Sequence, residues 1–326
     1  MVLVLSRSQV MSLLTMKESI DAVENAFREL ASGSAIMPTR VSVPIPLSDG
    51  WLGVMPAFLS QAKSLATKIV TVYPNNATQR GLPNVLASVV LNSTETGQVE
   101  AVMEGTFITA VRTGAVAGVA TKYLARKGSA KLGVFGCGVQ AETQLQAVCQ
   151  VRNIDTVMVY DSDKDRMRSF ISKSTRLNIQ PASNPKEVVQ ASDIIVTATT
   201  SATPVFNGSD LKPGTHINAI GAFTPDTREL DNQTITRAKI VVDSLAAALV
   251  EAGDIVIPLN EGVIRRENVW AELGEITAGS KPGRTSDDEV TVFKSVGLGI
   301  QDAAVARLVL EKARSKHIGT EVKLTD

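Results

Sequence analysis

The spacing of apolar residues near the start of the chain predicts a helix followed by a sheet. Ile20, Val23 and Phe27 recur at helical spacing behind Thr15 and Glu18, which have the spacing of a capping box. Apolar or alternating runs then follow, in order "RVSVPIPL", "WLGVMPAFL", "LATKIVTVYP" and "NVLASVVLN", and "STETG" leads from the last into "QVEAVME" like a hairpin turn. We therefore expect an α+β layer in the opening third.

Beyond this layer the pattern changes to alternating strands and helices. An Ala- and Gly-rich helix is expected from Thr106 to Gly128. Buried strands are then predicted at "KLGVFG", "TVMVYD", "DIIVTATT", "HINAIG" and "AKIVVDS", with helices between them such as "AETQLQAVCQVR" and "NPKEVVQAS". This is the pattern of an α/β fold with a doubly wound parallel sheet. The amphipathic stretch "GLGIQDAAVARLVLEKARSKH" is expected to return to the opening layer.

A glycine turn follows the first of these strands. Gly136, Gly138 and Ala141 form G-x-G-x-x-A between a strand and a helix, as in Rossmann-type domains that bind dinucleotides. The first glycine makes the tight turn, and the second lets backbone N–H groups approach a pyrophosphate. Val139 and Gln140, at the start of the helix, are expected to lie beside the cofactor as well.

An acidic residue ends the next strand. Asp161 lies about 20 residues after the glycine turn, where a carboxylate accepts hydrogen bonds from the ribose hydroxyls. It would repel a 2′-phosphate, so NAD(H) is favoured as the cofactor. Lys164 and Arg166 follow closely and leave NADP(H) as the alternative.

The loops after the later strands are expected to line the same cofactor cleft. They contain Thr199 in "TATTSA", and Ala219 and Gly221 in "NAIGAF". In a doubly wound sheet these loops leave the carboxyl ends of the strands, which is where ligands bind.

Three cations in apolar or small-residue surroundings are candidates for binding an anionic substrate. They are Arg40 in "MPTRVSV", Lys68 in "LATKIVTVYPNN" and Arg112 in "TAVRTGA". For any one of them, pairing with an internal carboxylate or reaching solvent is the simpler interpretation. Arg112 is the strongest candidate, because it is expected near the start of its helix, where anions are favoured. Asp302 is either a pocket residue or a surface carboxylate.

Composition excludes several function classes. Lys plus Arg and Asp plus Glu number 33 each, so no general field attracts nucleic acid or an anionic membrane. The two cysteines, Cys137 and Cys149, are expected to be buried thiols, and His216 and His317 lie too far apart in sequence to indicate a metal site. With neither a signal peptide nor a membrane span predicted, we expect a cytoplasmic protein.

Several stretches carry a family resemblance over nearly the whole chain. "KIVTVYPNN", "RGLPNVLASVVLN", "AVRTGAVAGVATKYLARK" and "GVFGCGVQAETQ" resemble the ornithine cyclodeaminase and mu-crystallin family. The resemblance implies a homodimer, with a substrate-binding and dimerisation domain at residues 1–118, a Rossmann domain for the nicotinamide cofactor at 119–298, and a C-terminal helix at 299–326 that completes the first domain.

The resemblance also assigns roles to individual residues. Arg40 and Arg112 would bind the substrate carboxylate, and Lys68 would be the active-site lysine. Arg112 and Thr113 would also help to bind the cofactor, Thr113 at the pyrophosphate, and Val296 would approach the nicotinamide.

One position departs from the family's cyclodeaminases. They carry an Asp two residues after the glycine that corresponds to Gly221, but this chain has Phe223, which cannot take a proton. Asp226 is a less direct substitute. We therefore expect reduction of a cyclic ketimine carboxylate, Δ1-pyrroline-2-carboxylate or Δ1-piperideine-2-carboxylate, to L-proline or L-pipecolate. The alternatives are an L-alanine dehydrogenase, then an ornithine cyclodeaminase or a non-catalytic protein that binds cofactor and ligand.

Overall fold

The computed structural model describes residues 1–173 and 177–324, and the chain divides into two compact units. Unit 1 comprises Met1–Arg112 and Leu298–Asp326, and unit 2 comprises Thr113–Gly297. The units therefore divide at 112/113 and 297/298, whereas the sequence places the domain boundaries at 118/119 and 298/299. Unit 2 is an insertion between two segments of unit 1.

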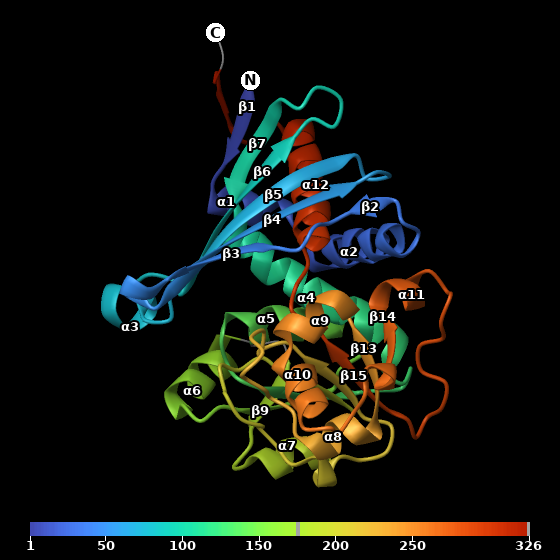
Figure 1. Cartoon of the computed structure of the whole chain (residues 1–326). Helices are drawn as coiled ribbons and strands as arrows, with labels where there is room; N and C mark the ends of the chain where they lie inside the picture. Colours follow the sequence, from blue (N-terminus) through green and yellow to red (C-terminus); the bar gives the residue numbers. More distant parts are fainter. Residues whose placement is uncertain (174–176, 325–326) are drawn as a thin grey trace. The chain divides into compact units, whose positions relative to one another are not determined.

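Unit 1 is built on a mixed sheet whose strands run in the order β16-β1-β7-β6-β5-β4-β2, with β3 also paired to β4. The first and last strands, β1 and β16, pair antiparallel, so the two ends of the chain lie together (Figure 1). The strands are β1 (Val2–Leu5), β2 (Ala35–Ile36), β3 (Val41–Ile45), β4 (Gly50–Leu59), β5 (Ser64–Val72), β6 (Val85–Asn92), β7 (Val99–Glu104) and β16 (Thr320–Val322).

Helices α2 and α12 cover one face of this sheet (Figure 1). The predicted helix after Thr15 is confirmed as α2, and the Thr15 hydroxyl oxygen accepts a hydrogen bond from the backbone N–H of Glu18 at 3.3 Å. The helices of unit 1 are α1 (Arg7–Leu13), α2 (Met16–Ala31), α3 (Asn76–Arg80) and α12 (Gly299–Lys316), with a 3₁₀ turn, η1, at Pro46–Ser48. The hairpin between β6 and β7 is confirmed too.

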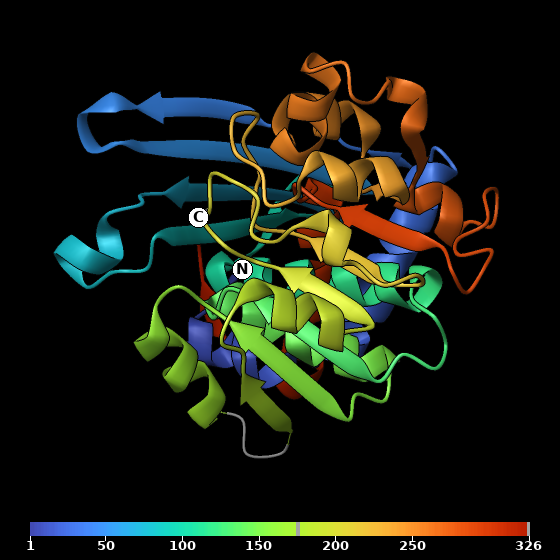
Figure 2. The ribbon, with the colours of Figure 1, turned by 90° about the horizontal axis from the view of Figure 1, so that it is seen from below.

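Unit 2 is a parallel sheet in the order β10-β9-β8-β11-β12-β15-β13-β14 (Figure 2). Its strands are β8 (Lys131–Phe135), β9 (Thr156–Tyr160), β10 (Asn178–Pro181), β11 (Ile194–Thr197), β12 (His216–Ala219), β13 (Ala238–Val242), β14 (Val269–Glu272) and β15 (Val290–Lys294). The five predicted strands and the doubly wound class are confirmed. The sequence pattern did not single out β15, which enters the sheet between β12 and β13.

Both faces of this sheet are covered. Ile194 and Val196 pack in a core beneath α5, whereas Ile195, between them, packs in the core on the opposite face. The helices are α5 (Val139–Val151), α6 (Lys164–Lys173), α7 (Pro185–Ala191), α8 (Asn232–Arg237), α9 (Leu245–Glu251), α10 (Gly253–Asn260) and α11 (Leu273–Thr277), with 3₁₀ turns η2 (Gly208–Asp210) and η3 (Arg266–Asn268). Helix α4 (Gly105–Leu124) runs from unit 1 into unit 2 and ends before the predicted Gly128.

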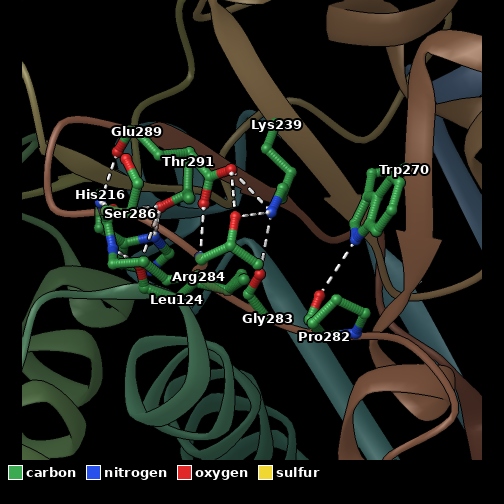
Figure 3. A network of polar contacts seen from close by, with 11 residues as sticks. Leu124, His216, Lys239, Trp270, Pro282, Gly283, Arg284, Ser286, Glu289 and Thr291 are labelled. Carbon is green, nitrogen blue, oxygen red and sulfur yellow. Dashed lines mark hydrogen bonds and ion pairs between the residues drawn. The ribbon is translucent and has the colours of Figure 1, made fainter.

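A buried polar network closes the amino edge of the unit 2 sheet (Figure 3). His216 Nδ1 lies 2.9 Å from the Thr291 hydroxyl, and the Arg284 guanidinium donates to the same hydroxyl and to the carbonyl of Leu124. Burial lowers the pKa of His216 to about 3, so the ring is neutral. His216 begins β12, at the opposite end of the strand from Ala219, and its contacts stabilise the fold.

Candidate functional site

Strand β5 turns one of the predicted cations into the interior of unit 1. Ala66, Lys68 and Val70 alternate with more exposed residues, and they lie on the face that α12 covers. Only 1 % of Lys68 is exposed. A fully buried ammonium is costly unless a partner compensates it, so this side chain needs a counter-charge.

Asp302 supplies that counter-charge from the first turn of α12. Lys68 Nζ lies 2.7 Å from Asp302 Oδ2, and Arg112 Nε lies 3.3 Å from Asp302 Oδ1. Arg112 also donates a hydrogen bond from a terminal nitrogen to Gln301 Oε1 at 2.7 Å. A strand, a helix and the C-terminal helix thus bring two cations and one carboxylate into a single buried cluster.

The surroundings of Lys68 change its protonation. Burial lowers its pKa to about 7, with further lowering by the charges of Arg112 and Arg40, while Asp302 acts in the opposite direction. Arg40, in the segment between β2 and β3, is half-buried. The three predicted cations are therefore close enough to interact, and Lys68 can give up or take a proton near neutral pH.

One expectation about this cluster was wrong, and one that had been left open is decided. Helix α4 begins at Gly105, so Arg112 lies about two turns inside it, beyond the reach of the helix N-terminus. Its charge is matched by Asp302 instead. Asp302 is 1 % exposed, which excludes a surface carboxylate. The position of this acidic residue inside the apolar stretch "GLGIQDAAVA" is the sequence signal that favours the buried alternative.

The glycine turn of unit 2 has the backbone geometry that a dinucleotide requires. Gly136 has a φ of +88°, and a Cβ there would lie 2.6 Å from the carbonyl oxygen of Ala198. Gly138 caps α5 without a side chain, and a Cβ there would meet nothing within 4 Å. The N–H groups of the first turn, including Val139 and Gln140, lie beside this open space, so the turn fits a pyrophosphate.

Asp161 lies directly after β9, at the neighbouring strand end. Its Oδ2 accepts a hydrogen bond from the Cys137 N–H at 2.8 Å, and its Oδ1 accepts one from Asp163 N–H at 2.9 Å. An ionised carboxylate has about four acceptor positions, so capacity remains for hydroxyl donors. This arrangement fits a ribose diol. Burial raises the pKa of the Cys137 thiol to about 12, which makes it unreactive.

The loops after β11 and β12 are joined by a carboxylate that the sequence reasoning did not assign to the site. Glu229 is buried and accepts hydrogen bonds from the N–H and hydroxyl of Thr199 and from the N–H of Gly221, each at 2.7 Å. Ala219 is the buried last residue of β12. Thr199, Ala219 and Gly221 therefore share the carboxyl edge of the sheet with the glycine turn.

Two further predicted cofactor residues are held by buried neighbours in unit 2. The N–H of Val296 donates to Asp243 Oδ2 at 2.8 Å, which fixes the turn after β15. The carbonyl of Thr113 accepts a hydrogen bond from the Gln144 amide at 2.9 Å, which joins α4 to α5.

The position that departs from the cyclodeaminases lies in the loop after β12. Phe223 is 37 % exposed, and Asp226, farther along this loop, is exposed as well. Neither side chain belongs to the buried cores of unit 2.

Within residues 1–173 and 177–324, no group of three or more His, Cys, Asp or Glu side chains is arranged to hold a metal ion. In the same residues, no helix is both long and apolar enough to cross a membrane.

Comparison with known proteins places these features in a family. A solved Δ1-pyrroline-2-carboxylate reductase of Thermococcus litoralis, in complex with NADH and L-proline, is 49% identical, with a TM-score of 0.95 over 98% of this chain and 100% of that one. A solved archaeal alanine dehydrogenase dimer with bound NAD is 42% identical, with a TM-score of 0.94 over 99% of each chain.

Among curated sequences, the alanine dehydrogenase of Archaeoglobus fulgidus is 44% identical over 98% of both chains. The family profile described as ornithine cyclodeaminase/mu-crystallin matches residues 1–317. The chain therefore belongs to the ornithine cyclodeaminase/mu-crystallin family.

Proposed function

We propose that this protein reduces a cyclic ketimine carboxylate with NADH, converting Δ1-pyrroline-2-carboxylate or Δ1-piperideine-2-carboxylate to L-proline or L-pipecolate. The observation that carries the proposal is the buried cluster in which Lys68 and Arg112 share Asp302. The Thermococcus litoralis reductase, which binds NADH and L-proline, supports the choice of substrate.

The cations of the cluster favour an anionic substrate. The charges that act on Lys68 come from Arg112, Arg40 and Asp302, so two guanidinium groups lie near the lysine. Guanidinium groups are well suited to bind a substrate carboxylate. In the proposed complex Arg112 and Arg40 hold that carboxylate, because a guanidinium can bind both of its oxygens at once.

Lys68 is the proposed proton donor. Reduction of C=N adds a hydride to carbon and a proton to nitrogen, and the Nζ of Lys68 gives that proton before regaining one from water. A pKa of about 7 suits an acid that works near neutral pH. Asp302 is then a positioning residue, since it holds Lys68 Nζ at 2.7 Å and keeps part of the population protonated.

Unit 2 is the proposed cofactor-binding unit. Gly136, Gly138 and the first turn of α5 would hold the pyrophosphate, with Thr113 assisting, while Asp161 would accept hydrogen bonds from the ribose hydroxyls. Val296 would lie by the nicotinamide. When bound, NADH supplies the hydride. The carboxylate of Asp161 disfavours the extra phosphate of NADPH.

An alanine dehydrogenase is the second candidate, because the relative from Archaeoglobus fulgidus carries that name at 44% identity. The same cations would hold the carboxylate of an open-chain imine formed from pyruvate and ammonia. Cyclisation of ornithine is less well supported, since Phe223 cannot accept a proton. A non-catalytic binding protein would need the charges but not a lysine with a pKa near 7.

The test is oxidation of NADH by the purified protein, followed with Δ1-pyrroline-2-carboxylate, Δ1-piperideine-2-carboxylate, and pyruvate with ammonia in parallel reactions. NADPH is offered as the second donor in each. Faster turnover of a cyclic imine is expected. Turnover with pyruvate and ammonia alone would identify an alanine dehydrogenase, and NADH binding without any turnover would favour the binding protein.

We also propose a homodimer formed through the face of the unit 1 sheet opposite α12. Val41, Val43, Ile69 and Leu86 lie on that face of neighbouring strands, and 39–57 % of each is exposed. The archaeal alanine dehydrogenase with 42% identity is a dimer. Light scattering should give twice the chain mass, and Ile69→Asp should give a monomer; a wild-type monomer would contradict the proposal.

A further inference from the structure

The loops after β11 and β12 depend on one buried side chain. Glu229 Oε1 accepts hydrogen bonds from the N–H and hydroxyl of Thr199, and Oε2 accepts from the hydroxyl of Thr197 and the N–H of Gly221, all at 2.7 Å. Each carboxylate oxygen therefore has two donors: the end of β11 contributes one, the loop after β11 two, and the loop after β12 one.

Glycine at 221 allows this close approach. A Cβ there would lie 2.5 Å from Glu229 Oε1 and would collide with the backbone of Thr199. Any larger residue would push the carboxylate away from one of its two loops. The two loops and Glu229 thus form one interlocked unit, and the glycine is required by packing against the carboxylate.

The backbone of Glu229 is held in place by a second pair of buried charged residues. Its backbone N–H donates to Asp254 Oδ1 at 2.8 Å, and Asp254 Oδ2 lies 2.8 Å from Lys294 Nζ. Lys294 also donates to the carbonyl of Ala222, in the same loop as Gly221. Glu229, Asp254 and Lys294 are all fully buried. The loop after β12 is therefore held by Glu229 at one residue and by Lys294 at the next.

We propose that Glu229 is a positioning residue of the cofactor site, whose carboxylate sets the backbone of the loops at Thr199 and Gly221 for binding of the dinucleotide. The inference rests on the proposed function, because it assigns a role in NADH binding. Glu229 does not belong to the Lys68 cluster in unit 1. Replacing Glu229 should therefore weaken binding of the cofactor and leave binding of the imine unchanged.

The first test is Glu229→Gln, with the affinity for NADH measured by the fluorescence of the bound cofactor. Glutamine replaces one acceptor oxygen with an NH₂ donor, so the backbone N–H at that oxygen loses its acceptor, while the threonine hydroxyl there can turn to accept. We expect the Kd and KM for NADH to rise at least about tenfold, which corresponds to about 1.4 kcal/mol. The KM for the imine should change less than about twofold.

Asp231→Asn is the matched control. Asp231 accepts hydrogen bonds from the N–H of Gly208 and from the N–H and hydroxyl of Thr234, which fix α8. It should lower the melting temperature with no change in the Kd for NADH. If Glu229→Gln lowers the melting temperature but leaves the Kd within twofold of wild type, Glu229 is merely structural and the inference is wrong.

A second variant guards against failure of Glu229→Gln to fold. Thr197→Val keeps the shape of a buried side chain at the end of β11 and removes one of the four donors to Glu229. A rise of about threefold in the Kd for NADH is expected, and an unchanged Kd would overturn the inference. Failure of the wild-type protein to bind NADH would instead contradict the proposed function.

Discussion

The two candidate sites are made of different chemical groups. In unit 2 the glycine turn offers backbone N–H groups and open space, and the residues that form it are neighbours in sequence. In unit 1 the cluster consists of charged side chains, Lys68, Arg112 and Asp302, from three distant segments. A site made of backbone groups can be predicted from a local sequence motif. The side-chain site of unit 1 forms only when the sheet, α4 and α12 pack together, so it cannot be predicted from a local motif.

The largest effect should come from replacing the proposed proton donor of the side-chain site. Replacing Lys68 with Met keeps the length of the side chain and removes the exchangeable proton, so kcat for the imine should fall by about 10³-fold. The affinity for NADH should stay within twofold of wild type. A Met variant that turns over at a tenth of the wild-type rate or faster would contradict the role of Lys68 as proton donor.

Asp302→Asn should have the next largest effect, a loss of about 10²-fold in kcat/KM, because it leaves two buried cations without their carboxylate. Asp302 raises the pKa of Lys68, so its loss should lower that pKa further. Since protonated Lys68 is the proposed acid, wild-type kcat/KM should fall as the pH rises through about 7, and kcat/KM of the variant should begin to fall at lower pH.

Glu311→Gln serves as the control for Asp302→Asn. Glu311 lies on the same helix, pairs with Arg307, and is 58 % exposed. It should leave the pH profile unchanged. If the profile of Asp302→Asn coincides with that of wild type, the carboxylate does not act on the titrating group.

Two alanine substitutions should distinguish the glycine that the fold requires from the glycine that cofactor binding requires. At Gly136, a φ of +88° and the nearby Ala198 carbonyl should make alanine cost at least about 1–2 kcal/mol of unfolding free energy. At Gly138 alanine has room, so stability should hold while the affinity for NADH falls about tenfold. Thermal melts and NADH titrations of both variants check this; equal melting losses would contradict it.

An effect as small as that of the Gly138 substitution is expected on the choice of cofactor. Asp161→Ser removes the charge that repels a 2′-phosphate, so the NADH-to-NADPH ratio of kcat/KM should fall about tenfold, or about 1.4 kcal/mol. Asp163→Asn is the control, because Asp163 accepts hydrogen bonds from the N–H groups of Asp165 and Arg166 at the start of α6. A ratio that Asp161→Ser leaves unchanged would show that Asp161 does not select the cofactor.

The fold was predictable where short-range patterns decide it. The strands at Lys131–Phe135 and Thr156–Tyr160 are continuous apolar runs, and the glycine turn between them follows a fixed spacing. Strand order was not predictable to the same extent, because the position of β15 between β12 and β13 depends on pairing between segments far apart in sequence.

The sites show the same division. Lys68 and Arg112 were identified as cations in apolar surroundings, but nothing local to either indicates that Asp302 is their partner. Glu229 was not assigned to the site for the same reason: its donors, Thr197, Thr199 and Gly221, become neighbours only when β11 and β12 pair. Partners of charged groups that are distant in sequence can be identified only from the structure.

The insertion of unit 2 into unit 1 has a consequence during synthesis of the chain. The ribosome makes β5 and the first half of α4 early, then all of unit 2, and only afterwards the helix that carries Asp302. Until that helix emerges, the nascent lysine at position 68 lacks its counter-charge. A nascent chain arrested before residue 298 would have the residues to fold unit 2 but would lack Asp302, so by the proposed mechanism we expect it to turn over no imine.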